Sequence, residues 1–371
     1  MRRIYVYAAG HYGQKLVKKI VSEGFGEQLF GLIDREPIAQ RFQGIPVLKV
    51  DDFLESEEKD VTIIIALADI IEAQFVACML YDAGYYNTYV LDNSVIPAGL
   101  TIFEKNGDFK PYIYSCKFYK PILPYLEVHV SEHCNMNCDY CAQFSNLVKG
   151  EVFSSLSRFA SDMRRLGEIF SGIKTIRLLG GEPFLNNELP QFAKISRDIF
   201  PYSEIVIVTN GLKINSITEY EWNIYKSLGV TVAVSYYRPL MPKLGDIIKT
   251  LEKHGIKHEI SPLWDEFWVN LNKNGNEEIN FAYANNCIGK ICNTLKEGRL
   301  FGCYLTPALK MLENELGISI SDEEYEAVSF DIYREYDWRY MFSLLYSPIS
   351  ICRFCGTIIN KKWTRNGRES G

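Results

Sequence analysis

Two stretches of the chain alternate short apolar runs with amphipathic segments. In the first stretch, strand-like runs occupy residues 3–9, 29–33, 61–67 and 88–91. Segments with helical spacing lie between them, notably at residues 10–24 and 68–84. Such alternation predicts strands that are separated by helices, and helical crossovers favour a parallel sheet.

The alternation resumes at residue 125 and continues to about residue 262. Strand-like runs occupy residues 125–130, 175–179, 205–208, 231–235 and 257–260. Helical patterns occupy residues 155–169, 188–199, 217–228 and 244–254. Repeated β/α units of this length predict a barrel or partial barrel, in which chemistry gathers at the carboxyl ends of the strands.

Composition narrows the class of function. With 371 residues, of which 47% are hydrophobic, the chain can form two or three domains with separate cores. The formal net charge is -6 and the signs are mixed along the chain, so we do not expect nucleic acid as a partner. The sequence shows neither an export signal nor an apolar run of membrane-spanning length, so we expect a cytoplasmic protein that binds no membrane.

Three of the ten cysteines, Cys134, Cys138 and Cys141, directly follow the strand expected at residues 125–130. Thiols stay reduced in the cytoplasm, so a group this tight indicates a metal site. Three thiolates can hold three irons of a 4Fe–4S cube and leave the fourth iron open to a small molecule. Zinc is the alternative, with His133 as a fourth ligand, but His133 adjoins Cys134 and joint ligation of one ion is sterically awkward.

The following strands of this stretch also end in residues that suit a binding site. These endings are Gly180-Gly181-Glu182-Pro183, Thr209-Asn210-Gly211 and Ser235-Tyr236-Tyr237. Two glycines let a ligand approach the backbone closely, and the Glu182 carboxylate can accept hydrogen bonds from an ammonium group. The structural alternatives are a simple turn for the Gly-Pro run and a backbone-satisfied serine at Ser235.

The spacing Cys-x3-Cys-x2-Cys, with an aromatic residue before the last cysteine and Gly-Gly-Glu-Pro about forty residues later, resembles the signature of the radical S-adenosylmethionine (SAM) superfamily. The resemblance implies that Cys134, Cys138 and Cys141 hold a 4Fe–4S cluster whose open iron binds SAM. It also implies a set of residues that contact this cofactor, namely Tyr140, Gly180, Gly181, Glu182, Pro183, Asn210 and Ser235. In this family the Gly-Gly-Glu equivalents bind the amino group of the methionine, and the equivalent of Tyr140 packs on the adenine.

A second set of cysteines lies in the last hundred residues: Cys287, Cys292, Cys303, Cys352 and Cys355. Residues 295–303 read as a hairpin that turns at Lys296-Glu297-Gly298. Two separated pairs of thiolates suit either zinc or a second iron–sulfur cluster. Beside a radical SAM core, the pattern resembles a SPASM extension or its shorter Twitch form. This resemblance implies one auxiliary 4Fe–4S cluster on four of the five thiols, with Cys287 or Cys292 left over.

The first strand of the chain leads into the turn Ala8-Ala9-Gly10-His11-Tyr12-Gly13, a dinucleotide fingerprint with alanine at its first glycine position. Asp34 follows Gly13 by 21 residues. One interpretation is a nucleotide site, in which amides near Gly10 hold a phosphate and Asp34 meets a ribose or sugar hydroxyl. The other is a Rossmann-like unit whose glycines serve only packing. Residues 30–48 resemble the N-terminal domains of sugar-modifying acyltransferases and some methyltransferases.

We therefore predict an α/β protein with three domains. They are a Rossmann-like parallel-sheet domain at residues 1–110, a partial (β/α)6 radical SAM barrel at residues 120–275 and a SPASM/Twitch-like cluster-binding extension at residues 276–371. Residues 360–371 are expected to be a frayed tail.

The resemblance implies an enzyme that reductively cleaves SAM to a 5'-deoxyadenosyl radical, with an electron donor such as flavodoxin or ferredoxin. The N-terminal domain favours a carbohydrate or nucleotide-sugar substrate, which would be oxidised or epimerised. Cys116, Tyr236 and Tyr237 are the candidates for returning a hydrogen in an epimerisation. Two alternatives stay open: a peptide (RiPP-type) maturase, and a non-catalytic metal or electron-transfer protein.

Overall fold

The computed structural model describes residues 3–55, 58–91, 101–104, 108–110, 113–115, 120–317, 320–335 and 337–365. The chain forms two compact units, Met1–Pro124 with Ile169–Gly172 and Tyr125–Glu168 with Ile173–Gly371. The boundary expected at residue 276 falls inside the second unit. Within the described residues, none of the helices combines the length and the apolar character that a membrane span requires.

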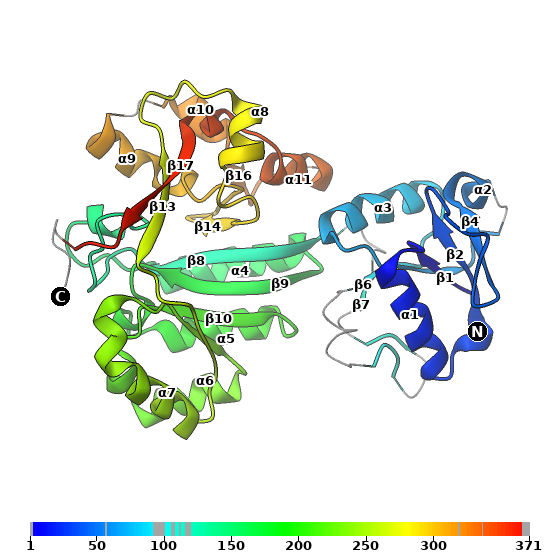
Figure 1. Cartoon of the computed structure of the whole chain (residues 1–371), viewed down its shortest axis with the longest axis horizontal. Helices are drawn as coiled ribbons and strands as arrows, with labels where there is room; N and C mark the ends of the chain where they lie inside the picture. The colour runs from blue at the N-terminus through cyan, green and yellow to red at the C-terminus, as the bar shows by residue number, and fades with distance from the viewer. Residues whose placement is uncertain are drawn as a thin grey trace. The chain divides into compact units, whose positions relative to one another are not determined.

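The first unit is a mainly parallel sheet with helices on both faces (Figure 1). Its elements are β1 (Ile4–Tyr7), α1 (His11–Ser22), β2 (Leu29–Asp34), β3 (Arg41–Phe42), β4 (Ile45–Lys49), α2 (Val50–Leu54), β5 (Thr62–Ile65), α3 (Ile70–Asp82), β6 (Thr88–Leu91) and β7 (Ile113–Ser115). In the described part of the chain the strand order is β3-β4-β2-β1-β5-β6-β7, and only the edge strands β3 and β7 pair antiparallel. The predicted parallel α/β arrangement is confirmed. The sequence analysis did not predict β3, β4, α2 and β7.

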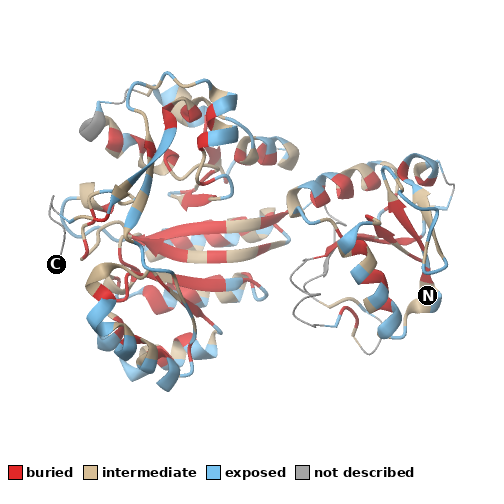
Figure 2. Cartoon of the chain, viewed as in Figure 1, coloured by how far each residue is buried: buried red, intermediate tan, exposed pale blue. Residues whose placement is uncertain are grey.

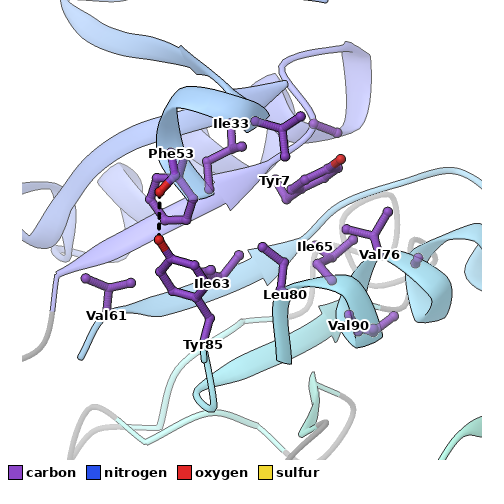
Figure 3. Close-up of a cluster of buried hydrophobic side chains, with 14 of the residues drawn as sticks. Tyr7, Ile33, Phe53, Val61, Ile63, Ile65, Val76, Leu80, Tyr85 and Val90 are labelled. Carbon is purple, nitrogen blue, oxygen red and sulfur yellow. Dashed lines mark hydrogen bonds between the residues drawn. The ribbon is translucent and has the colours of Figure 1, made fainter. Parts of the chain in front are cut away.

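Alternate residues of the central strands of this unit enter two different cores. Ile63 and Ile65 of β5 belong to one buried cluster with α3, whereas Ile64 belongs to another with α1. Figure 3 shows the first cluster, in which the Tyr85 hydroxyl donates a hydrogen bond to the Phe53 carbonyl at 2.7 Å. Because successive side chains of a strand point to opposite faces, both faces of this sheet are covered.

The second unit begins with five parallel strands, β8 to β12, which alternate with four α-helices. Its elements are β8 (Ile122–Ser131), α4 (Leu156–Ile169), β9 (Gly172–Gly180), α5 (Leu189–Ile199), β10 (Glu204–Thr209), α6 (Glu219–Ser227), β11 (Thr231–Val234), α7 (Leu244–Lys253), β12 (Lys257–Ile260), β13 (Glu266–Leu271), α8 (Ile279–Phe281), β14 (Thr294–Lys296), β15 (Arg299–Phe301), α9 (Leu309–Leu316), α10 (Asp322–Ala327), β16 (Phe330–Asp331), α11 (Trp338–Tyr346) and β17 (Cys355–Lys362). Across the described residues the main sheet runs β12-β11-β10-β9-β8-β14-β15-β16.

The parallel run β8 to β12 confirms the predicted partial barrel, with one difference at each edge of the run. The next strand along the chain, β13, pairs antiparallel with β17 instead of lying beside β12 (Figure 1). On the other edge, β14 pairs parallel with β8 and turns into β15. This is the predicted hairpin, and its turn residues Glu297 and Gly298 have φ angles of 50° and 77°.

Strand β8 carries a different kind of residue on each of its two faces. One face presents Leu126, Val128 and Val130, and the other presents Glu127, His129 and Ser131. All six residues are buried, and Figure 2 shows how little of the centre of this sheet is exposed. A row of polar groups therefore lies inside the second unit, where each group needs a partner or a ligand.

Candidate functional site

A cavity of about 200 Å³ lies where the parallel strands of the second unit end. Cys134, Cys138 and Cys141 of the loop after β8 all line it. The same cavity is lined by predicted residues from the three following strand ends: Gly180, Gly181, Asn210, Ser235 and Tyr237. The structure therefore brings together eight of the side chains and backbone positions that the sequence singled out, from four separate strands.

The two glycines after β9 allow the cysteine loop to pack directly on the strand end. Gly180 has φ +123°, and a Cβ atom there would lie 2.1 Å from the Ser131 carbonyl oxygen. A Cβ atom on Gly181 would lie 2.0 Å from the carbonyl oxygen of His133. The Gly181 amide donates to the Ser131 carbonyl at 2.7 Å. Any larger residue would displace the backbone that carries Cys134, so these glycines serve packing as well as the cavity.

Glu182 is fully buried and does not line the cavity. Its carboxylate accepts hydrogen bonds from the Thr209 hydroxyl at 2.8 Å and from the Asn210 amide at 2.8 Å, both at the end of β10. Burial raises the pKa of Glu182 to about 7, although these hydrogen bonds act in the opposite direction. In this arrangement Glu182 joins the ends of β9 and β10 and positions Asn210. Its predicted contact with a cofactor amino group stays a prediction.

Each thiol of the first group has a polar neighbour. Asn210 donates from Nδ2 to the Cys134 sulfur at 3.4 Å, Trp363 donates from Nε1 to the Cys138 sulfur at 3.2 Å, and the Ser145 hydroxyl lies 3.2 Å from the Cys141 sulfur. Burial raises the pKa of Cys134, and raises that of Cys138 to about 12. Without a metal these two thiols are neutral at physiological pH, and an iron cluster would have to displace their protons.

Residues 363–365 hold the cysteine loop from the carboxyl-terminal side. The Asp139 amide donates to the Thr364 carbonyl at 3.0 Å, and the Thr364 hydroxyl donates to the Asp139 carboxylate at 2.6 Å. Trp363 is only 2% exposed. The expectation of a frayed tail is therefore wrong for residues 360–365, which continue β17 and then pair with the loop. The tryptophan that anchors this segment lies 225 residues from Cys138 in the chain, and no local period marks it.

The residues present fit a 4Fe–4S cluster better than a single ion. Among the described residues, no group of three or more His, Cys, Asp and Glu side chains could hold one metal ion. A cube places each thiolate on a different iron, so the sulfur atoms need not converge on one point. Three thiols beside an open cavity supply three corners of such a cube and leave space at the fourth.

Three other predicted residues lie away from this cavity. Tyr140 is 38% exposed and Pro183 begins a short 3-10 helix, Pro183–Leu185. The Tyr236 amide donates a hydrogen bond to the Ser261 hydroxyl at 2.9 Å.

Among the candidates for returning a hydrogen, Cys116 lies outside the described residues and Tyr237 lines the cavity. Burial, and then the three neighbouring thiols, raise the pKa of Tyr237 above its ordinary value.

The five C-terminal cysteines all belong to the second unit. Cys352 and Cys355 belong to an apolar cluster against which Cys303 packs. Burial raises the pKa of Cys355, and the thiols of Cys303, Cys287 and Cys352 raise it further. For Cys292, burial and then the Glu127 carboxylate raise the pKa to about 12, ahead of any thiol.

In the first unit, the fingerprint turn is closed by the unit's own side chains. The Asp34 carboxylate accepts the Ala9 amide at 2.7 Å and the Glu36 amide at 3.1 Å. A Cβ atom on Gly13 would lie 1.6 Å from the Ala8 carbonyl oxygen, so this glycine serves packing. By contrast, a Cβ atom on Gly10 would meet no described atom within 4 Å apart from its chain neighbours, so close packing does not require this glycine.

Sequence reasoning missed several residues of the cysteine cavity. Met136, Gln143 and Ser145 belong to the cysteine loop, where their closeness to the ligand triplet was a usable signal. Phe267 reaches the cavity from β13, and Trp363 reaches Cys138 from the segment after β17. No pattern in the sequence connects these last two residues to the site, because their pairing is long-range.

Comparison with known proteins finds similarity over the part of the chain that carries this site. Residues 128–260 match the family model of the radical SAM superfamily. The GTP 3',8-cyclase of Sulfurimonas denitrificans is 31% identical over 104 residues, which cover 27% of this chain and 32% of that protein. The 7,8-dihydro-6-hydroxymethylpterin dimethyltransferase of Methanocaldococcus jannaschii is 30% identical over 104 residues, which cover 28% of this chain and 20% of that protein. The chain thus spans less than a third of the length of these curated relatives.

Solved structures align with this chain at low identity and with low TM-scores. A crystal structure of BtrN in complex with AdoMet and 2-DOIA superposes with a TM-score of 0.41 and 18% identity, over 63% of this chain and 92% of that chain. Streptococcus suis SuiB gives a TM-score of 0.31 and 14% identity, over 51% of this chain and 39% of that chain. The family match spans β8 to β12 together with the cysteine loop and the glycine pair. Residues 128–260 of this chain are thus similar to the radical SAM superfamily.

Proposed function

We propose that this protein is a radical SAM enzyme that removes a hydrogen atom from a carbohydrate or nucleotide-sugar substrate. The observation that carries the proposal is the cavity in which three cysteine thiols face the glycine pair of β9 and the polar ends of β10 and β11. The proposed reaction is an oxidation, an epimerisation or a related modification of this substrate.

The chain's own residues have separate tasks at this cavity. Cys134, Cys138 and Cys141 would hold a 4Fe–4S cluster, and the backbone of Gly180 and Gly181 would face the bound S-adenosylmethionine. When bound, the cluster and S-adenosylmethionine supply a 5'-deoxyadenosyl radical that abstracts the hydrogen atom. The buried ring of Trp363 and its donated hydrogen bond to Cys138 shield the cluster side of the cavity from water.

We assign an auxiliary 4Fe–4S cluster to Cys287, Cys303, Cys352 and Cys355, in a SPASM/Twitch-like extension. The Cys287 thiol raises the pKa of each of the other three, and Cys303 and Cys352 also raise that of Cys355, which supports this set. The Asn286 side chain, which donates to the Cys355 carbonyl at 3.0 Å, places the backbone next to Cys287 at the same point. Cys292, on whose pKa the Glu127 carboxylate acts more strongly than any thiol, is the fifth thiol and is left without a cluster.

The first unit is proposed to bind the nucleotide part of a substrate at the turn that carries Gly10. The open space beside Gly10 at the start of α1 supports this assignment. Asp34 already accepts two backbone amides, so its contribution is to hold the turn in shape. Gly13 contributes the close contact between α1 and the end of β1.

Anaerobic reconstitution with iron and sulfide, followed by dithionite and S-adenosylmethionine, tests the function. We expect 5'-deoxyadenosine to form, with an iron content of about eight atoms per chain for two cubes. Cys138→Ser should abolish 5'-deoxyadenosine, whereas Cys78→Ser, which changes a residue of α3 in the first unit, should not. Fully loaded protein that releases no 5'-deoxyadenosine would contradict the proposal.

A further inference from the structure

A second cavity adjoins the cysteine cavity and has walls of a different chemistry. Its volume is about 520 Å³, and Gln143 lines both cavities. On another side it is lined by Tyr304, which follows Cys303 of the C-terminal cysteine group. The cavity therefore lies beside both proposed cluster sites, where a substrate has to be held if its hydrogen is removed at one of them.

Three ionisable side chains form a charged patch on the wall of this cavity. The Glu132 carboxylate lies 3.2 Å from His129 Nδ1 and 3.0 Å from Lys296 Nζ. The other ring nitrogen of His129, Nε2, lies 3.0 Å from Gln143 Oε1, which extends the network to the cysteine cavity. We call His129, Glu132 and Lys296 the cradle.

The cradle depends on the pairing of β14 with β8. Leu295 of β14 is in register with Val128 of β8, so the next step along both strands brings Lys296 beside His129. Glu132 then lies just beyond the end of β8, and its amide donates to the Val152 carbonyl at 2.9 Å. The side chains of Glu132 and Lys296 are 16% and 30% exposed, so both are held in place and still reachable.

The cradle offers both donors and acceptors at one point. Glu132 contacts His129 through one carboxylate oxygen and Lys296 through the other. A glutamate carboxylate is ionised at physiological pH and has lone pairs that these two partners do not use. Lys296 has three N–H donors, and its contact with Glu132 accounts for one of them.

A carboxylate and an ammonium group side by side match two neighbouring hydroxyl groups. Each hydroxyl can donate to Glu132 and accept from Lys296. A bare phosphate is a poorer match, because Glu132 neutralises the lysine and repels an anion. The rest of the wall carries Lys149 and is otherwise largely apolar, with Phe144, Tyr304 and Met311, which suits the C–H face of a saturated ring.

We propose that this cavity holds the hydroxylated ring of the substrate, with neighbouring hydroxyl groups on Glu132 and Lys296 and the ring face against Tyr304. The inference rests on the proposed function, because it places a carbohydrate ring next to the cysteine cavity. It names the residues that select the ring, whether that ring is a free sugar or the sugar of a nucleotide-sugar.

Binding is tested on reconstituted protein with S-adenosylmethionine and no reductant, so that no turnover occurs. The probes are methyl glycosides of common hexoses and N-acetylhexosamines, and the corresponding UDP-, dTDP- and GDP-sugars, and dissociation constants are measured by calorimetry. We expect at least one probe to bind, and Lys296→Met to weaken its binding by about tenfold to a hundredfold. Lys249→Met, on the exposed face of α7, should leave binding unchanged.

A second variant keeps the test informative if one substitution harms folding. Glu132→Gln removes the charge and keeps the side-chain volume, and it should weaken the same probe by about tenfold or more. Equal binding by a glycoside and its nucleotide-sugar shows that the ring alone is recognised. Tighter binding of the nucleotide form, with the same loss in Lys296→Met, shows a ring site plus a second contact.

The inference is overturned if no probe binds, or if the bound probe is unaffected by both cradle substitutions. The inference is also overturned if a neutral peptide displaces the bound probe and binds with the same affinity as the sugar. These outcomes are separate from failure of the proposed function, which is measured as 5'-deoxyadenosine after reduction. Sugar binding without 5'-deoxyadenosine leaves the cradle standing, whereas 5'-deoxyadenosine without sugar binding removes it.

Discussion

The two groups of cysteines in the second unit differ in what surrounds them. Cys134, Cys138 and Cys141 line an open cavity together with two glycines and the polar strand ends. Cys352 and Cys355 lie instead in a cluster of apolar side chains, and Cys303 packs against it. Three thiols at a cavity would leave one metal corner for a small molecule, whereas the proposed second set, in which Cys287 joins these three thiols, would close its site with four ligands. Cysteine spacing alone does not make this distinction.

Removing each group of cysteines in turn tests whether the two groups have separate roles. Replacing Cys134, Cys138 and Cys141 with alanine should lower the iron content by about four atoms and abolish 5'-deoxyadenosine formation. Replacing Cys352 and Cys355 with alanine should remove the other four or so irons and leave 5'-deoxyadenosine formation without substrate intact. Iron assay and product chromatography measure both effects. If both replacements abolish 5'-deoxyadenosine in folded protein, the two groups do not act separately.

One pair of variants tests whether Cys287 or Cys292 belongs to the ligands of the second cluster. Cys287→Ser should cost about four irons per chain, whereas Cys292→Ser should keep about eight. The reason is that the thiols of Cys303, Cys287 and Cys352 all raise the pKa of Cys355. The pKa of Cys292 is affected more strongly by the Glu127 carboxylate than by any thiol. Iron analysis and Mössbauer spectra check the result. The reverse outcome would exchange the two assignments.

The packing of the first group on the glycine pair predicts a large structural effect. In Gly181→Ala, the new methyl group would lie 2.0 Å from the His133 carbonyl oxygen, so the cysteine loop has to move. We expect a loss of more than about 4 kcal/mol in the free energy of unfolding, and a first cluster that no longer assembles. Gly245→Ala is the matched control, because its methyl group meets no described atom within 4 Å. An assembled cluster in Gly181→Ala would contradict the packing argument.

Glu182, which lies at the strand end beside the first group of cysteines, predicts that the stability of the folded protein depends on pH. Burial raises its pKa in the folded protein to about 7, above the value of 4.5 for an unperturbed glutamic acid. Because the folded state binds this proton more tightly, the stabilisation is complete below about pH 4.5 and is lost as the pH rises through about 7, a change of about 3 kcal/mol. Thermal unfolding midpoints between about pH 5 and about pH 8 measure it. Glu182→Gln should flatten this dependence, and an unchanged slope would assign it to another group.

The smallest expected effect concerns the hydrogen bond from Trp363 to Cys138. Trp363→Phe keeps an aromatic ring in the buried site and removes the N–H donor to the sulfur. Hydrogen bonds to ligand sulfurs raise the reduction potential of a cluster, so the variant should have a more negative midpoint potential. Trp268→Phe, at an exposed position of β13, is the control. Spectroelectrochemical titration of the first cluster measures the shift, and equal potentials in both variants would remove the role of Trp363.

Much of the fold and the centre of the site could be predicted from local sequence. The strands and helices of both β/α stretches follow from apolar runs and helical spacing, since each element leaves its own period. The three cysteines of the first group and the glycine pair are short motifs at strand ends, where the fold brings them together. The tail around Trp363 was predicted wrongly, because an isolated tryptophan in a polar segment carries no period.

The sequence by itself determined the parallel α/β architecture, the two groups of thiols and the strand ends at which the first group lies. Only the tertiary structure decided that Glu182 joins two strand ends, that Trp363 reaches Cys138 and that Lys296 stands beside His129 and Glu132. The physical reason is the range of the contacts. Periodicity and motifs record neighbours along the chain, whereas these contacts depend on which strands pair and in which register.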